Sequence, residues 1–156
     1  MPSAFTETRT ESVLTNSTQL NAPLQRQIRV LIVSPLVEVR RRLLQALEKL
    51  STDVLVCSTL AQAEEVLLLK AVVVVFCDEH LADGSYQDLI HAEHFDHRVP
   101  RVVVTTRTGD WELYFLAVAR GAFDVIRSPW HATDVEMVVI RALRDEQQGL
   151  STEAAA

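Results

Sequence analysis

The chain has 156 residues and a formal net charge of −6, because 21 acidic residues outnumber 15 basic ones. This length fits one domain that buries about 70% of its unfolded surface, and a 48% apolar share with only four glycines and five prolines excludes collagen-like and wholly disordered chains. The acidic balance argues against binding of nucleic acid through its phosphates, since such domains are usually strongly basic.

The first 27 residues are rich in Ser, Thr, Asn and Gln and contain no sustained apolar period. They lack the basic-then-apolar order of a signal peptide, and no apolar stretch of the chain approaches the roughly 18 residues of a membrane span. We interpret residues 1–27 as a flexible N-terminal extension and residues 148–156 as a flexible C-terminal tail. The protein is expected to be cytoplasmic, with no membrane or nucleic-acid partner.

Between these flanks, residues 28–147 alternate short β-branched runs with segments of helical period. The predicted strands are residues 29–33, 53–57, 71–77, 101–105 and 123–126. The predicted helices are residues 37–50, a segment that opens with a Thr59–Gln62 capping box, and residues 85–95, 110–120 and 133 to about 147. Five strand–helix repeats predict an α/β domain with a doubly wound, five-stranded parallel sheet.

Two cysteines, Cys57 and Cys77, are too few for a disulfide framework or a four-ligand zinc site. Each lies inside an apolar run. We therefore interpret both as small core residues.

Polar side chains follow the predicted strands at the edge where chemistry collects in parallel sheets, outside the carboxyl ends. Asp78 comes directly after the most apolar strand, where its carboxylate needs solvent, a cation or hydrogen-bond donors. Thr105 and Thr106 bring hydroxyls to the same edge, and residues 127–129 bring an arginine and a serine. Such groups together could hold a phosphoryl group; the structural alternative is that Asp78 only caps the following loop.

Four stretches of the core carry a family resemblance: RVLIV, VVVVFCDEHLADGS, PRVVVTTRTGD and RGAFDVIRSPW. Across residues 29–147 the sequence resembles a receiver domain of bacterial two-component response regulators, the fold typified by the chemotaxis response regulator. The resemblance implies a flavodoxin-like (βα)5 receiver fold. It also implies that Asp78 is the phosphoacceptor, a nucleophile towards a phosphohistidine or a small phosphodonor, and that Thr105 is the switch hydroxyl.

The sequence departs from this family where the metal ion is bound. Ser34 and Pro35 stand where the family has the acidic pair that helps bind Mg²⁺, an ion usually held by one or two carboxylates plus phosphate and waters. Asp78 and the backbone carbonyl of His80 are the implied ligands that remain, so Mg²⁺ binding should be weak or absent and phosphoryl transfer slow. The structural alternative is that Ser34 and Pro35 serve as the N-cap and first residue of a helix.

The family lysine before the last proline is also missing. Ser128 occupies its place and carries no charge. Arg127 is the cationic neighbour, but adjacent strand residues point to opposite faces of a sheet. Of the 15 basic residues only Lys49 and Lys70 are lysines, and neither follows a predicted strand. The sequence therefore predicts an atypical, degenerate receiver.

Two rival classes of site are less well supported. His91, His94 and His97, interleaved with Glu93 and Asp96, resemble a transition-metal cluster, but a solvated helix end explains them better. The first strand–helix turn has neither a glycine fingerprint nor a P-loop, and no G-x-S-x-G elbow occurs. We therefore expect no enzyme.

The predicted function is that of a stand-alone receiver in a phosphorelay, because only residues 148–156 follow the last predicted helix. A sensor histidine kinase or phosphotransfer protein would phosphorylate Asp78. Output would be contact with a downstream protein partner or with a second copy of the chain as a homodimer. Trp111, Tyr114 and Trp130 lie on or near the expected contact face, or else belong to the core. The alternative function is a phosphorylation-independent pseudo-receiver that acts as a binding or scaffold module.

Overall fold

The computed structural model describes residues 27–91 and 99–155, and in it five parallel strands form one sheet in the order β2-β1-β3-β6-β7. The strands are β1 (Ile28–Val33), β2 (Thr52–Cys57), β3 (Val74–Asp78), β6 (Arg101–Thr106) and β7 (Asp124–Arg127). A two-stranded antiparallel ribbon of β4 (His80–Leu81) and β5 (Gly84–Ser85) follows the central strand. The predicted parallel sheet is confirmed.

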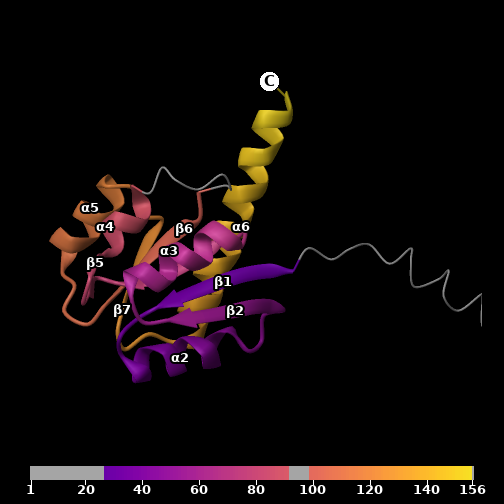
Figure 1. Ribbon diagram of the computed structural model, residues 1–156. Coiled ribbons are helices and arrows are strands. Elements are labelled where there is room, and N and C mark those ends of the chain that lie inside the picture. Colours follow the sequence, from indigo (N-terminus) through magenta and orange to yellow (C-terminus); the bar gives the residue numbers. More distant parts are fainter. Residues whose placement is uncertain (1–26, 92–98, 156) are drawn as a thin grey trace, which may run out of the picture.

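Helices cover both faces of this sheet (Figure 1). On one face lie α2 (Val37–Leu47) and α6 (Ala132–Ala155), which contact each other; on the other lie α3 (Leu60–Leu69), α4 (Tyr86–Ile90) and α5 (Trp111–Ala119). The sheet is therefore doubly wound. Among the described residues, no helix is both long enough and apolar enough to cross a membrane.

Strand β1 shows how the sequence produces these layers. Leu31 and Val33 belong to the core beneath α3, while Val30 and Ile32 belong to the core beneath α2 and α6. All four side chains are inaccessible to solvent, as expected for a parallel strand covered on both faces. Burial of each such side chain stabilises the fold by about 1.5–3 kcal/mol.

The strand register brings the carboxyl ends of the strands to one edge. Val33 of β1 pairs with Cys77 of β3, and Asp78 pairs with Thr105 of β6. Because Ser34 directly follows Val33, it lies level with Asp78 on the opposite side from Thr105. The two strands that flank β3 therefore each present a hydroxyl to Asp78.

Side-chain caps begin three of the helices. Thr59 accepts a hydrogen bond from the Gln62 N–H at the start of α3, which confirms the Thr59 cap, whereas the Gln62 side chain accepts from the Ser58 N–H and not from Thr59. Ser85 caps α4 in a reciprocal box with Asp88, and Asp110 accepts from the Leu113 N–H at the start of α5. These caps satisfy backbone donors that have no partner within the helix.

The last helix is longer than predicted. We expected it to end near residue 147 and residues 148–156 to be a flexible tail, but α6 continues to Ala155, and Figure 1 shows its last turns extending beyond the sheet. Gly149 lowers helix stability by only about 1 kcal/mol relative to alanine, and the hydroxyls of Ser151 and Thr152 donate to carbonyls one turn earlier.

Two expectations concern residues that the structure does not describe. The N-terminal extension, apart from residue 27, lies outside the described residues. So do four residues of the histidine motif, Glu93, His94, Asp96 and His97. The remaining histidine, His91, follows the end of α4 at Ile90, five residues before the predicted end of that helix.

Candidate functional site

Asp78 ends the central strand β3, and its carboxylate is held by hydroxyl groups. Ser34 Oγ donates to Asp78 Oδ2 at 2.7 Å, and Thr105 Oγ1 donates to Asp78 Oδ1. The side chains of Ser34, Asp78 and Thr105 are all buried, with exposed fractions of 1%, 9% and 3%. A buried carboxylate without donors would be costly, and these two bonds satisfy one lone pair on each oxygen.

The structural explanation of Ser34 as a helix N-cap is wrong. Helix α2 begins at Val37, and its N-cap residue is Leu36, which makes no side-chain cap. The Leu36 N–H does donate to Ser34 Oγ at 3.1 Å, so the Ser34 oxygen orders the turn before the helix. Its own proton goes to Asp78 instead.

Helix α2 carries three consecutive arginines, Arg40, Arg41 and Arg42, and each of them forms a polar contact within the chain. Arg40 Nη1 donates to the Ser34 carbonyl at 2.7 Å. Arg41 and Arg42 both form ion pairs with Glu38, at 2.7 and 2.9 Å, and these guanidinium groups lower the pKa of Glu38. Arg40 thus supports the turn that carries Ser34, while its two neighbours form exposed pairs that contribute little stability.

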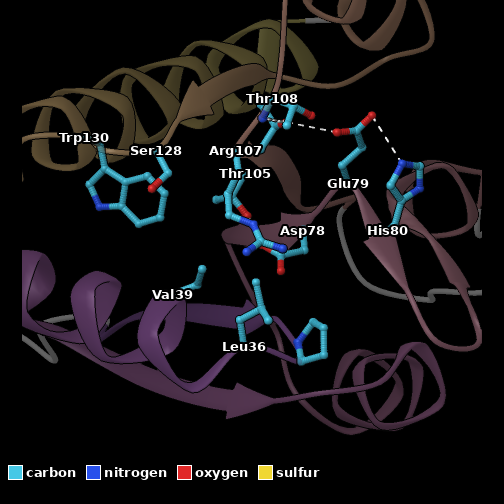
Figure 2. A pocket seen from close by; sticks show the side chains of 12 residues that line it. Leu36, Val39, Asp78, Glu79, His80, Thr105, Arg107, Thr108, Ser128 and Trp130 are labelled. Atoms are coloured by element: carbon cyan, nitrogen blue, oxygen red, sulfur yellow. Dashed lines mark hydrogen bonds and ion pairs between the residues drawn. The ribbon is translucent and has the colours of Figure 1, made fainter.

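A cavity of about 370 Å³ opens above Asp78 at the edge of the sheet (Figure 2). Its polar lining includes Asp78, Thr105, Arg107 and Ser128, and its apolar lining includes Leu36, Val39 and Trp130. Ligand sites in proteins commonly have volumes of about 300–1,000 Å³. The cavity is therefore large enough for a phosphoryl group and part of its donor.

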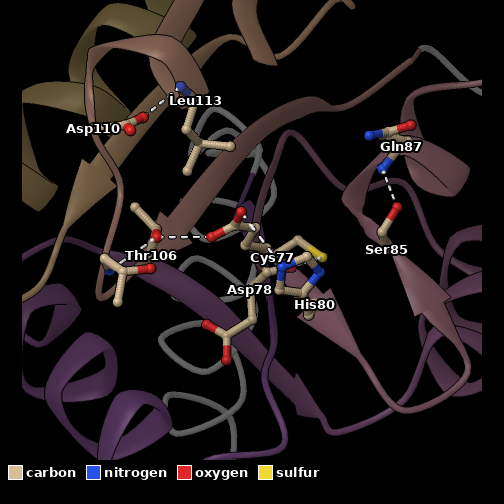
Figure 3. A network of polar contacts seen from close by, with 10 residues as sticks. Cys77, Asp78, His80, Ser85, Gln87, Thr106, Asp110 and Leu113 are labelled. Atoms are coloured by element: carbon tan, nitrogen blue, oxygen red, sulfur yellow. Dashed lines mark hydrogen bonds and ion pairs between the residues drawn. The ribbon is translucent and has the colours of Figure 1, made fainter. Parts of the chain in front are cut away.

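Glu79 brings a second carboxylate to this cavity. Thr106 Oγ1 donates to Glu79 Oε2 at 2.9 Å, and the exposed His80 places Nε2 at 3.4 Å from Glu79 Oε1. Figure 3 shows Thr106 and His80 beside Asp78, and Figure 2 shows the Glu79 and Asp78 carboxylates directed to different sides. Thr106, predicted at the same edge as Thr105, thus bonds Glu79 and not Asp78.

The positively charged side chain at this cavity belongs to Arg107, which the sequence did not predict as a site residue. Arg127 lines a different cavity together with Asp134 and Arg141, whereas Ser128 lines the cavity of Asp78. Arg107 lines the Asp78 cavity, and in Figure 2 its side chain points towards Asp78. Its position in the loop after β6, two residues beyond Thr105, is the signal that could have revealed it.

The residues at this edge do not fit a bound Mg²⁺. Ser34 is neutral and Pro35 has no side-chain ligand, while each Asp78 oxygen already accepts a hydrogen bond. Within residues 27–91 and 99–155, no group of three or more His, Cys, Asp or Glu side chains is arranged to hold a metal ion. His80, whose carbonyl was expected to be a ligand, begins β4 and pairs with Ser85.

The two cysteines are not nucleophiles at neutral pH. Burial raises the pKa of Cys57 to about 11, and burial together with the nearby Asp78 charge raises the pKa of Cys77 further. A thiol is reactive mainly as the thiolate. Both thiols therefore stay protonated, in agreement with their interpretation as core residues.

Comparison with solved structures gives matches to receiver domains. The signal receiver domain of an HD domain-containing protein from Pseudomonas fluorescens Pf-5 matches with a TM-score of 0.73 and 20% identity, over 83% of this chain and 96% of that one. A CheY-like response regulator receiver domain from Methanospirillum hungatei JF-1 matches with a TM-score of 0.67 and 19% identity, over 78% and 98%. This chain has the receiver fold.

A larger protein contains the same fold as one part. NtrX from Brucella abortus matches with a TM-score of 0.72 and 24% identity, over 83% of this chain but only 30% of the NtrX chain. No protein-family model matches the sequence, and no curated protein matches it significantly. Recognition of the receiver fold therefore depends on the three-dimensional structure together with the motifs around Asp78.

Proposed function

We propose that this chain is a receiver module of a two-component phosphorelay in which Asp78 accepts a phosphoryl group from a sensor histidine kinase or a phosphotransfer protein. The observation that carries the proposal is the position of Asp78: a carboxylate at the carboxyl end of the central strand of a receiver fold, bonded to Thr105 and open to a cavity. The module is not an enzyme and acts in the cytoplasm.

Phosphorylation of Asp78 is a single displacement at phosphorus. An Asp78 carboxylate oxygen forms a bond to phosphorus while the bond from phosphorus to the donor nitrogen or oxygen breaks, and the leaving group takes the electron pair. Positioning and charge stabilisation dominate catalysis of such transfers. The Thr105 hydroxyl and the Arg107 guanidinium, both at the cavity, are the groups of this chain that would contact the transferred oxygens.

Output is protein–protein contact with a downstream partner. Helix α5 supports this proposal, because Trp111 and Phe115 are 77% and 66% exposed and pack with Tyr114 as a surface aromatic cluster, with ring centroids 5.8–6.3 Å apart. Exposed aromatic residues are common anchors of interfaces. Trp130, in contrast, is half-buried against the core beneath α6.

One observation favours the second candidate function, a phosphorylation-independent pseudo-receiver that serves as a binding module. The Ser34 and Thr105 hydroxyls satisfy Asp78 without a phosphoryl group or a metal ion. A module of this kind would bind its partner in a single constitutive state.

Intact mass spectrometry distinguishes the two functions. The protein is incubated with acetyl phosphate, and separately with a phosphorylated histidine kinase, and its mass is compared with that of Asp78→Asn. A mass increase of one phosphoryl group in the wild type alone supports the phosphorelay function. An unmodified mass with every donor supports the constitutive binding module.

A further inference from the structure

Ser34 is buried, and hydrogen bonds hold its N–H, its carbonyl and its hydroxyl. Its N–H donates to the Cys57 carbonyl at 3.1 Å, its carbonyl accepts from Arg40 Nη1 at 2.7 Å, and its Oγ accepts from the Leu36 N–H at 3.1 Å. A serine hydroxyl has one proton to donate. With the main chain fixed on both sides, that proton is directed to Asp78 Oδ2, 2.7 Å away.

A divalent cation at Asp78 would compete with this hydroxyl for the same oxygen. Mg²⁺ prefers a near-octahedral shell of oxygens that includes one or two carboxylates. Ser34 provides a neutral group where a second carboxylate would strengthen the site. The other carboxylate of the cavity, Glu79, is engaged by Thr106 and lies beside His80.

From this geometry we propose that Ser34 takes the place of a metal ion at Asp78. Its hydroxyl holds one carboxylate oxygen, Thr105 holds the other, and the pair keeps the site in a state that does not bind Mg²⁺. The meaning of this state for phosphoryl transfer rests on the proposed function, whereas the metal-binding behaviour itself does not.

Paramagnetic titration tests the proposal. Mn²⁺ is added to the isotopically labelled full chain, and broadening of the backbone amide signals of Asp78 and Glu79 is followed by NMR, with Mg²⁺ as competitor. The wild type shows no saturable, Mg²⁺-competed broadening at these residues. Ser34→Asp places a second carboxylate against the first and raises Mn²⁺ and Mg²⁺ affinity by about 10- to 100-fold.

Ser58→Asp is the matched control. Ser58 follows β2 at the same edge of the sheet, and its hydroxyl bonds Gln62 and not Asp78. The same substitution there adds one strand-end carboxylate without placing it beside Asp78, so no gain in metal affinity is expected. An equal gain in Ser58→Asp and Ser34→Asp would show a general charge effect and overturn the proposal.

Two further results would also overturn it. One is saturable binding of Mg²⁺ by the wild type at Asp78, a result that decides the question even if Ser34→Asp does not fold. The other is a folded Ser34→Asp, by circular dichroism, that gains no metal affinity. Phosphorylation is scored separately by intact mass with Mg²⁺ or with EDTA: no adduct in either protein refutes the proposed function and leaves the metal result standing.

Discussion

Single residues around Asp78 explain how a carboxylate can end the most apolar strand of the chain. β3 is buried along its whole length, and an ionised group there is tolerated only with donors. Ser34 and Thr105 are those donors. Both are neutral, so the cation that a phosphoryl group requires must come from elsewhere at the cavity, and Arg107 is the arginine that lines it.

Arg107→Ala is expected to slow phosphorylation of Asp78 by acetyl phosphate by about tenfold or more, the equivalent of one hydrogen bond to a charged group. The guanidinium would no longer face the transferred oxygens. The rate is measured by intact mass over time, and Arg107→Lys should restore part of it. Arg127→Ala is the control, because Arg127 is exposed and lines a different cavity. Equal rates for Arg107→Ala and Arg127→Ala would contradict this role.

At the scale of elements, Asp83 ties the ribbon that follows Asp78 to helix α3. Its carboxylate accepts from the Leu60 N–H at 2.8 Å and from the Ala61 N–H at 3.0 Å. The bonds from Ala61 and Leu60 lower the pKa of Asp83. Negative charge at a helix N-terminus is favourable, so this contact holds α3 and the ribbon together.

This contact predicts a pH dependence of stability. Because folding lowers the pKa of Asp83, its bonds stabilise the protein above about pH 4, and that stability is lost as the pH falls through the folded-state pKa. In urea denaturation, the difference in free energy of unfolding between wild type and Asp83→Asn should shrink below about pH 4. The exposed Glu64→Gln controls for loss of one charge. A difference that stays constant across this range would contradict the contact's role.

Replacement by alanine should change the stability of the protein in opposite directions at two glycines, one after α5 and one within α6. Gly121 lies two residues after the end of α5 with φ +109°, and a Cβ there would lie 3.0 Å from Ile90, so Gly121→Ala should destabilise by about 1–3 kcal/mol. Gly149 lies within α6, and a Cβ there would meet no neighbouring atom within 4 Å, so Gly149→Ala should stabilise by about 0.5–1 kcal/mol. Thermal denaturation measures both. A stabilising Gly121→Ala, or a destabilising Gly149→Ala, would contradict the structure at that position.

For the molecule as a whole, the order of the elements was predictable from the sequence because each strand contains a short apolar run. β1 and β3 contain continuous apolar runs, Val30–Val33 and Val74–Cys77, since both their faces are covered, and five strand–helix repeats allow few arrangements other than a parallel sheet. The same order places Asp78 and Thr105 on neighbouring strands at one edge, a juxtaposition that the register confirms.

The rest depends on side-chain geometry that spacing does not encode. The Ser34–Asp78 bond joins residues 44 positions apart and could be found only from the strand register. Arg107 lies in a loop, where no periodicity fixes its direction. The predicted end of α6 is too early because the polar residues after position 147 continue the helix, with the hydroxyls of Ser151 and Thr152 bonded to carbonyls one turn earlier.

Whether Asp78 carries a phosphoryl group can be decided by locating the modification in the full chain. After incubation with acetyl phosphate or a phosphorylated kinase, borohydride reduces an aspartyl phosphate to homoserine, and peptide mass spectrometry identifies the residue. We predict homoserine in place of Asp78, formed with EDTA as well as with Mg²⁺, and none in Asp78→Asn. Unreduced Asp78 with every donor, or modification at another residue, would contradict the proposed phosphorelay function.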